Sequence, residues 1–124
     1  MSLEFKFKDI NAVGNKKPSC RIELNGDTVF TGEVEQHIKV ESETKSSNVL
    51  RIFFENKNDH DTIVNEHNEI VKDLNFKLEK IVIDGLNLKN LIWESRYVAG
   101  DKTIESCLFF GPKGYWEIKF DSPI

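Results

Sequence analysis

The sequence predicts an all-β fold: an antiparallel, jelly-roll-like β-sandwich formed by a single domain over residues 1–124. Short runs rich in Phe, Ile, Val and Leu recur along the chain, and turn-forming residues separate them at close spacing. Two strongly strand-like runs, residues 50–55 and 76–84, flank a loop dense in Asp, Asn, Glu and His. Nine Phe, two Trp and a hydrophobic content of 39% supply enough large side chains for one packed core.

The first elements show the two-residue period of strands. Leu3, Phe5 and Phe7 alternate with charged residues, which is typical of a strand with one face on a core and one in water. Residues 20–34 contain two such runs around Asn25-Gly26. A type I′ turn needs positive φ at both central positions, and Asn and Gly tolerate this conformation best. We therefore predict a β-hairpin over residues 20–34.

The later elements follow the same pattern with one irregularity. Residues 38–40 suggest a further strand, and residues 41–48 form a polar loop by composition. In the run 76–84, the alternation slips once near Glu79-Lys80, for which a β-bulge is the usual physical cause.

The last third of the chain is also read as strands. Residues 87–97 have roughly helical spacing in part, but a strand is preferred because the segment follows a turn in a β pattern. The runs 104–110 and 115–120 are separated by Gly-Pro-Lys-Gly, which suits a hairpin loop.

Charge and length exclude several partners. The formal charge is −4, from 21 acidic and 17 basic residues that are interspersed, so no basic patch is available for nucleic acid. No apolar run approaches the roughly 20 residues that cross a bilayer, which argues against a membrane partner. The N-terminus MSLEFKFKDI lacks the apolar core of a signal peptide. We expect a soluble chain that is cytoplasmic when made.

The two cysteines are expected to be free thiols. Cys20 and Cys107 lie far apart in sequence and each lies beside a strand-like run, so they pair only if the fold places them together. Neither a cysteine-dense framework nor an export signal is present. Two buried or half-buried thiols are therefore the preferred state.

No catalytic pattern is found. The chain lacks a Gly-x-Ser-x-Gly elbow, a phosphate-binding glycine loop and a metal-binding His-x-x-x-His pair. Carboxylates are numerous, but the sequence does not assign acid and base roles to any of them. We therefore expect a protein that is not an enzyme.

The polar loop between the two strongest strands offers many oxygen ligands. Its carboxylate and amide side chains suit a hard cation such as calcium, although the spacing of an EF-hand is absent. The alternative is a solvated loop whose Asx residues cap turns, and on local evidence this alternative is favoured. The candidate ligands in the loop are Asn56, Asn58, Asp59, Asp61, Glu66, Asn68, Glu69, Asp73 and Asn75.

Aromatic side chains are the candidates for contact with a ligand. Trp and Tyr rings supply a large apolar contact and keep a polar atom free, which suits a partly wet sugar site. Trp116 alternates with Ile118 and Phe120, so it is assigned to the core. Tyr97 and Tyr115 have charged or glycine neighbours and are the better surface candidates, with Trp93 as a third.

Three stretches resemble calcium-dependent xylan-binding carbohydrate-binding modules. They are IELNGDTVFTGEV (residues 22–34), VLRIFFENK (residues 49–57) and DLNFKLEKIVIDG (residues 73–85). In that family a strand with Val-Asn-Gly leads to a hairpin, and an Asp-Arg-Asn-Leu-like segment opens a later strand. The resemblance implies a non-catalytic module that binds a polysaccharide or a cell-surface glycan with the help of calcium. It makes Asp73 the leading calcium ligand, followed by Asp59 and Asp61, with Asn75 at a matching place.

The stretch NKNDHDTIVNEHNEIVKDLNF (residues 56–76) also resembles small proteins of tailed phages that infect marine cyanobacteria. This second resemblance implies a β-sandwich that serves as a virion accessory or assembly protein without a sugar ligand. Such a protein is expected to form a homo-oligomer through an apolar surface patch.

Overall fold

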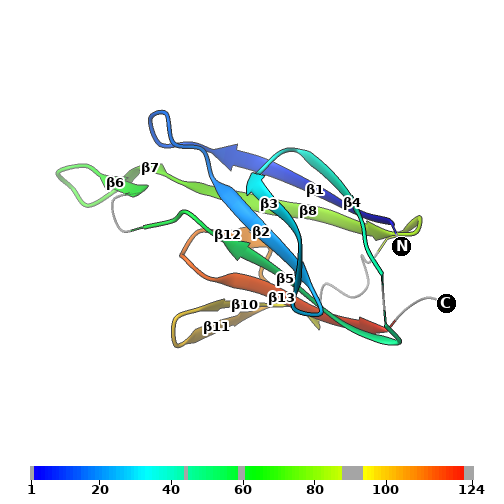
Figure 1. The fold of residues 1–124 in the computed structure, drawn as a ribbon. Helices are drawn as coiled ribbons and strands as arrows, with labels where there is room; N and C mark the ends of the chain where they lie inside the picture. Colours follow the sequence, from blue (N-terminus) through cyan, green and yellow to red (C-terminus); the bar gives the residue numbers. More distant parts are fainter. Residues whose placement is uncertain (1, 44, 59–60, 88–93, 122–124) are drawn as a thin grey trace.

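The computed structural model is a sandwich of two antiparallel sheets (Figure 1), described here for residues 2–43, 45–58, 61–87 and 94–121. One sheet has the order β12-β8-β1-β4, with β9 paired to β8. Its strands are β1 (Ser2–Asn11), β4 (His37–Glu41), β8 (Asn75–Ile83), β9 (Leu86–Asn87) and β12 (Phe109–Phe110). The predicted all-β antiparallel sandwich is confirmed, and its jelly-roll-like arrangement stays a prediction.

The second sheet has six strands in the order β11-β10-β13-β5-β2-β3. They are β2 (Ser19–Leu24), β3 (Asp27–Glu33), β5 (Ser47–Phe54), β10 (Arg96–Ala99), β11 (Lys102–Glu105) and β13 (Tyr115–Asp121). A separate hairpin of β6 (Thr62–Val64) and β7 (Ile70–Asp73) extends beyond the two sheets at the left of Figure 1. This hairpin lies within the polar loop, where no strand was predicted. Within the described ranges, no helix has the length and apolarity that a membrane crossing requires.

The core lies between the sheets because the inward positions of the main strands are apolar. Leu3, Phe5 and Phe7 of β1 are fully buried, as the alternation predicted. Phe76 is at the centre of an aromatic cluster: its ring stacks on Phe110 at 4.5 Å between centroids and meets the ring edges of other phenylalanines. Trp116 is buried as well, which confirms its assignment to the core.

The predicted hairpin and the predicted bulge are both confirmed. Asn25 and Gly26 join β2 to β3 with φ values of 54° and 87°, as a type I′ turn requires. In the pairing of β1 with β8, Lys6 faces Lys80, whereas Phe7 faces Leu78, so Glu79 is the extra residue. The bulge lets β8 keep apolar side chains in the core on both sides of the slip.

The predicted hairpin of residues 104–110 with 115–120 is wrong. The first run divides into β11, which pairs with β10, and β12, which pairs with β8 in the opposite sheet. Ser106 has a φ of 53°, and the chain crosses between the sheets after this residue. The crossing places Phe110 in the core against Phe76 and Tyr97, which a simple hairpin would not do. Of the predicted strand over residues 87–97, the structure describes Asn87, which ends β9, and residues 94–97, of which only Arg96 and Tyr97 belong to a strand, β10.

Candidate functional site

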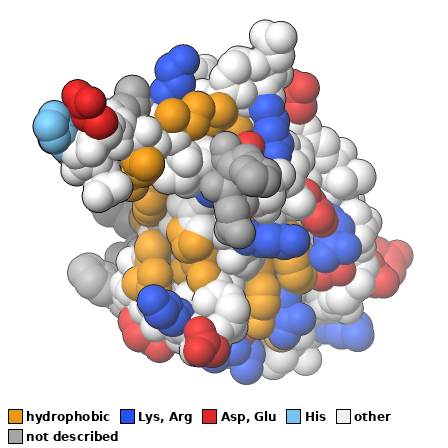
Figure 2. All heavy atoms as spheres, turned by 90° about the vertical axis from the view of Figure 1, so that its left-hand side faces the viewer, with side chains coloured by type: hydrophobic (Ala, Val, Ile, Leu, Met, Phe, Trp, Pro, Cys, Tyr) orange, Lys and Arg blue, Asp and Glu red, His pale blue; other side chains and the backbone are white. Residues whose placement is uncertain are grey.

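A cleft of about 540 Å³ lies where the β6–β7 hairpin approaches the segment after β12. Its apolar lining comes from Ile70, Phe109 and Pro112. Its polar lining comes from Lys57, Asn58, Thr62, Asp73 and Lys113. Figure 2 views the molecule from this end and shows hydrophobic side chains gathered among charged ones. The cleft therefore combines exposed apolar surface with several hydrogen-bonding groups.

Asp73 is the most constrained polar side chain of the cleft. It ends β7, and Leu74 alone separates it from β8. Its Oδ1 accepts hydrogen bonds from Lys57 Nζ and, at 2.6 Å, from Thr62 Oγ1. Its Oδ2 accepts one from Asn75 Nδ2 at 3.0 Å. Partial burial alone raises the pKa of Asp73, but the hydrogen bonds from Lys57, Thr62 and Asn75 outweigh it and lower the pKa below the ordinary value. Asp73 is therefore an oriented carboxylate at neutral pH.

Asp61 has a lysine partner of its own. Its Oδ2 lies 2.6 Å from Lys16 Nζ and accepts a hydrogen bond from the backbone N–H of Asn58 at 2.9 Å. Burial raises the pKa of Asp61, and the contacts with Lys16 and Asn58 lower it by more, so the group is ionised. The backbone N–H of Leu74 donates to the Asp61 carbonyl at 2.9 Å, which fixes this segment beside the start of β8.

These contacts do not fit a calcium ion. Calcium takes about six to eight oxygen ligands. The carboxylates of Asp73 and Asp61 each already contact a lysine ammonium, which occupies the place of a metal cation. The Oδ1 of Asn75 accepts a hydrogen bond from Asn11 Nδ2 at 2.7 Å. Among the residues that the structure describes, no group of three or more His, Cys, Asp or Glu side chains is arranged to hold a metal. Asp59 lies outside the described residues, and calcium binding stays a prediction.

The prediction that Tyr97 is a surface aromatic is wrong. Tyr97 is fully buried, meets the Phe110 ring edge-on at 5.2 Å, and donates its hydroxyl hydrogen bond to the Pro112 carbonyl. The register explains the burial: Tyr97 pairs with Trp116 across β10 and β13, and both side chains point into the core. Tyr97 therefore supports the cleft wall at Pro112 from behind. Trp93 lies outside the described residues.

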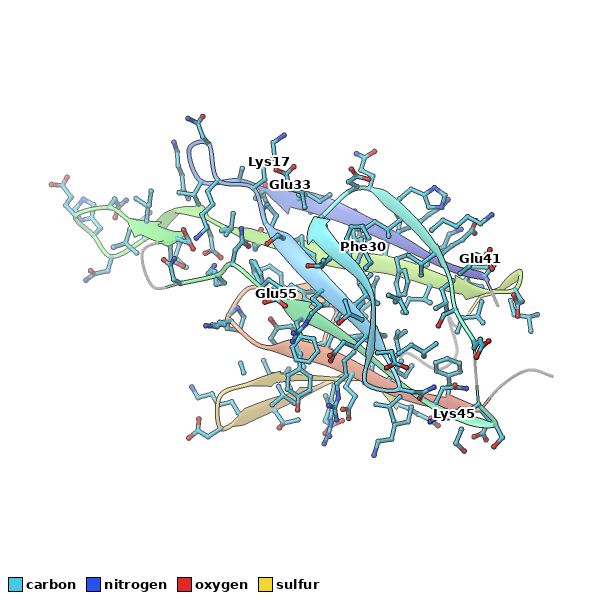
Figure 3. All side chains as sticks on the ribbon, viewed as in Figure 1. Lys17, Phe30, Glu33, Glu41, Lys45 and Glu55 are labelled. Carbon is cyan, nitrogen blue, oxygen red and sulfur yellow. The ribbon has the colours of Figure 1, made fainter. Side chains whose placement is uncertain are left out.

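Tyr115 is half-buried, but it lies on a different surface, the outer face of the six-stranded sheet. It pairs with Phe53 on β5, and the two rings are 5.2 Å apart. The guanidinium of Arg21 lies 4.3 Å from the Phe53 ring centroid, and its Nε lies 2.9 Å from Glu55 Oε1. Glu55 is labelled in Figure 3, just beyond the end of β5. Tyr115 thus belongs to a row of cross-strand contacts and does not line the cleft.

The comparisons with known proteins give one likeness of fold. No family model matches the chain. A solved structure described as "vCBM60 in complex with galactobiose" superimposes with a TM-score of 0.60 over 98% of both chains, at 15% sequence identity. At that identity, the likeness shows a shared fold, that of a carbohydrate-binding module.

One curated sequence is also similar in part. The chain is 29% identical over 98 residues to the probable kinetochore protein NDC80 of Candida glabrata. The match covers 76% of this chain but spans only 14% of the length of that protein. It does not assign the chain to a family.

Of the residues that line the cleft, sequence reasoning had singled out only Asn58 and Asp73, and it missed Phe109 and Lys57 among others. Phe109 was included in the strand-like run 104–110 without a role of its own, whereas it is 39% exposed beside the buried Phe110. Lys57 was passed over as one residue of a polar loop, whereas it is 8% exposed. The signal for Phe109 was present in the Phe-Phe pair, because neighbouring residues of a strand point to opposite faces.

Proposed function

We propose that this protein is a non-catalytic module that binds carbohydrate in the cleft beside Asp73. The observation that carries the proposal is the position of an exposed Phe109 and an exposed Ile70 in the same cleft as an oriented carboxylate. The likeness of fold to a carbohydrate-binding module supports it.

The chemistry of the cleft suits a sugar ring. A pyranose has a face of C–H groups that packs on an apolar or aromatic surface, and hydroxyl groups at its edge that need hydrogen-bond partners. Phe109 and Ile70 supply the first kind of contact, and Asp73 accepts from the hydroxyls while Lys113 donates to them. A volume of about 540 Å³ lies within the range of small-ligand sites.

The same carboxylates favour binding over hydrolysis. A glycosidase pairs an ionised carboxylate with a second carboxyl group whose raised pKa keeps it protonated as the general acid. The pKa values of Asp73 and Asp61 are both lowered, because each accepts hydrogen bonds from a lysine. Neither residue is suited to donate a proton at neutral pH.

The experiment is a calorimetric titration of the protein with galactobiose and with xylo-oligosaccharides. Phe109→Ala removes the exposed ring from the cleft, and we expect an affinity loss of about tenfold, a typical cost of deleting an aromatic contact. Tyr115→Ala is the matched control, because it removes an aromatic ring from the outer sheet face and leaves the cleft unchanged.

The two variants distinguish binding in the cleft from binding on the outer face of the six-stranded sheet. Binding that Phe109→Ala weakens and Tyr115→Ala preserves supports the cleft. Binding that is lost only in Tyr115→Ala moves the site to the outer face. Absence of binding to galactobiose, xylo-oligosaccharides and a wider glycan array contradicts the proposed function.

A second candidate function, assembly through self-association, is favoured by the β6–β7 hairpin. Ile63, Val64 and Ile70 are 41%, 50% and 66% exposed on this hairpin, which among the described residues pairs with neither sheet. A two-stranded ribbon is only marginally stable alone, and a second copy of the chain would cover its apolar side chains. Light scattering should then give a dimer mass that Val64→Lys reduces to that of the monomer, and a monomeric wild type contradicts this candidate.

A further inference from the structure

We propose that Lys57 is the resident cation of this site: its ammonium group neutralises and orients Asp73, so that the cleft binds its ligand without calcium. This inference rests on the proposed function for the ligand, but the role of Lys57 is tested independently of any sugar.

The environment of Lys57 is that of a bound cation. Its side chain is 8% exposed, and its Nζ donates to Asp73 Oδ1 and to the Leu74 carbonyl at 2.6 Å. The ammonium also lies 5.7 Å from the centroid of the Phe54 ring. A lysine this deeply buried is unfavourable unless its charge is compensated, and the Asp73 carboxylate provides that compensation.

Lys57 also fixes the geometry of the cleft. It follows β5 by three residues, whereas Asp73 and Leu74 form the junction of β7 and β8, so the lysine connects two segments that are distant in the sequence. Thr62 Oγ1 donates to the same Oδ1 and Asn75 Nδ2 donates to Oδ2, so the carboxylate is held in one orientation at the wall of the cleft. Lys57 is therefore a positioning residue for Asp73.

Among the described residues, the charges around the two aspartates leave little attraction for a divalent ion. Asp61 and Asp73 each have a lysine within contact distance, Lys16 and Lys57, so the four charges cancel. A calcium ion that approached Asp73 Oδ1 would have to displace a buried ammonium and would be repelled by it until it did. Removing the ammonium should leave Asp73 with a free negative charge beside the Leu74 carbonyl, and such oxygen atoms attract a hard cation.

The test is a thermal-unfolding series in EDTA and in graded calcium chloride. We expect the wild type to have the same midpoint in all solutions, because a ligand raises the midpoint only if it binds the folded state. Lys57→Met keeps much of the side-chain volume and removes the charge. We expect its midpoint in EDTA to fall by roughly 5–10 °C, and calcium to restore part of that loss.

Lys113→Met is the matched control, because it removes the same charge from the exposed rim of the same cleft. It should keep the wild-type midpoint and should gain no response to calcium. A merely structural role for Lys57 would lower the midpoint of Lys57→Met without creating a calcium response, and this result would overturn the proposal.

A saturable rise of the wild-type midpoint with calcium would also overturn it, and this arm does not depend on whether Lys57→Met folds. A parallel titration of the wild type with galactobiose in EDTA and in calcium should give equal affinities. If no sugar binds in either solution, the proposed function fails, whereas the unfolding series still decides the role of Lys57.

Discussion

Arg51 and Glu117 occupy directly paired positions of β5 and β13, and Arg51 Nε donates to Glu117 Oε2 across 2.6 Å. On the other side of β13, Arg96 of β10 donates to Glu117 Oε1 from Nε and from an Nη atom. The carboxylate is 2% exposed although it lies on the outer face of the sheet, because the two arginines cover it. One acidic side chain therefore links three adjacent strands.

Glu117→Gln should destabilise the protein. The amide keeps the shape of the carboxylate, but it cannot accept charge-assisted hydrogen bonds from two arginines at once. Since both arginines are nearly half exposed, solvent screening reduces the loss, and we expect about 1–2 kcal/mol of unfolding free energy. Urea denaturation measures it. Glu79→Gln, at an exposed position of β8 in the other sheet, is the control and should change stability very little.

Stability should fall in acid. Burial raises the pKa values of Glu117, Asp73 and Asp61, but hydrogen bonds from their basic partners outweigh it and lower each pKa below its unfolded value. Groups of this kind contribute stability that is complete above the unfolded pKa values of about 4. That contribution is lost as the pH falls through the folded pKa values. Unfolding free energies measured from pH 7 to pH 3 should be level at first and decline below about pH 4.5. A stability that is unchanged at pH 3 would contradict the ion pairs.

The sequence predicted those strands in which apolar and polar residues alternate over six or more positions. In β1, β2 and β5 the apolar positions recur over three or more pairs, so the inward face is unambiguous. The inward face of β10 could not be predicted in this way, because the strand has only four residues. Which of its side chains point into the core is set by its pairing with β13. For this reason Tyr97 was expected outside and lies inside.

The site was predictable only in part. The composition of the loop that contains Asp61 and Asp73 indicated a polar site. Asp73 lines the cleft, and Asp61 contacts Asn58, which also lines it. Their lysine partners lie 45 and 16 residues away in the sequence, and no local pattern indicates such pairs. The exposed Phe109 depends on the chain crossing between the sheets, which was predicted as a hairpin.

The two thiols should differ in reactivity. Both cysteines are free, as predicted: Cys20 is fully buried and Cys107 is partly exposed. Burial raises the pKa of Cys20 to about 12, assisted by the charge of Glu55, so its thiolate is negligible at neutral pH. A disulfide reagent should therefore modify one thiol per native chain and a second only after unfolding. Cys107→Ser should abolish the native reaction, and two rapid modifications of the native wild type would contradict the structure.

Gly114 is the position at which a single methyl group should cost most. A Cβ built there would lie 2.1 Å from the Val98 carbonyl oxygen, which is backbone and cannot move aside. The Gly114 carbonyl also accepts a hydrogen bond from the Phe54 N–H at 2.9 Å, so a local shift would disturb the end of β5. We expect Gly114→Ala to lower the unfolding free energy by roughly 2–3 kcal/mol.

Gly111→Ala tests whether this cost comes from the backbone contact. Its Cβ would lie 2.7 Å from a ring atom of Phe109, and this side chain is exposed enough to turn away. The substitution should therefore cost less than about 1 kcal/mol in urea denaturation, although the displaced ring should weaken sugar binding in the cleft. If both substitutions lower the unfolding free energy equally, the backbone around Gly114 can move away from the Val98 carbonyl, and the predicted clash is wrong.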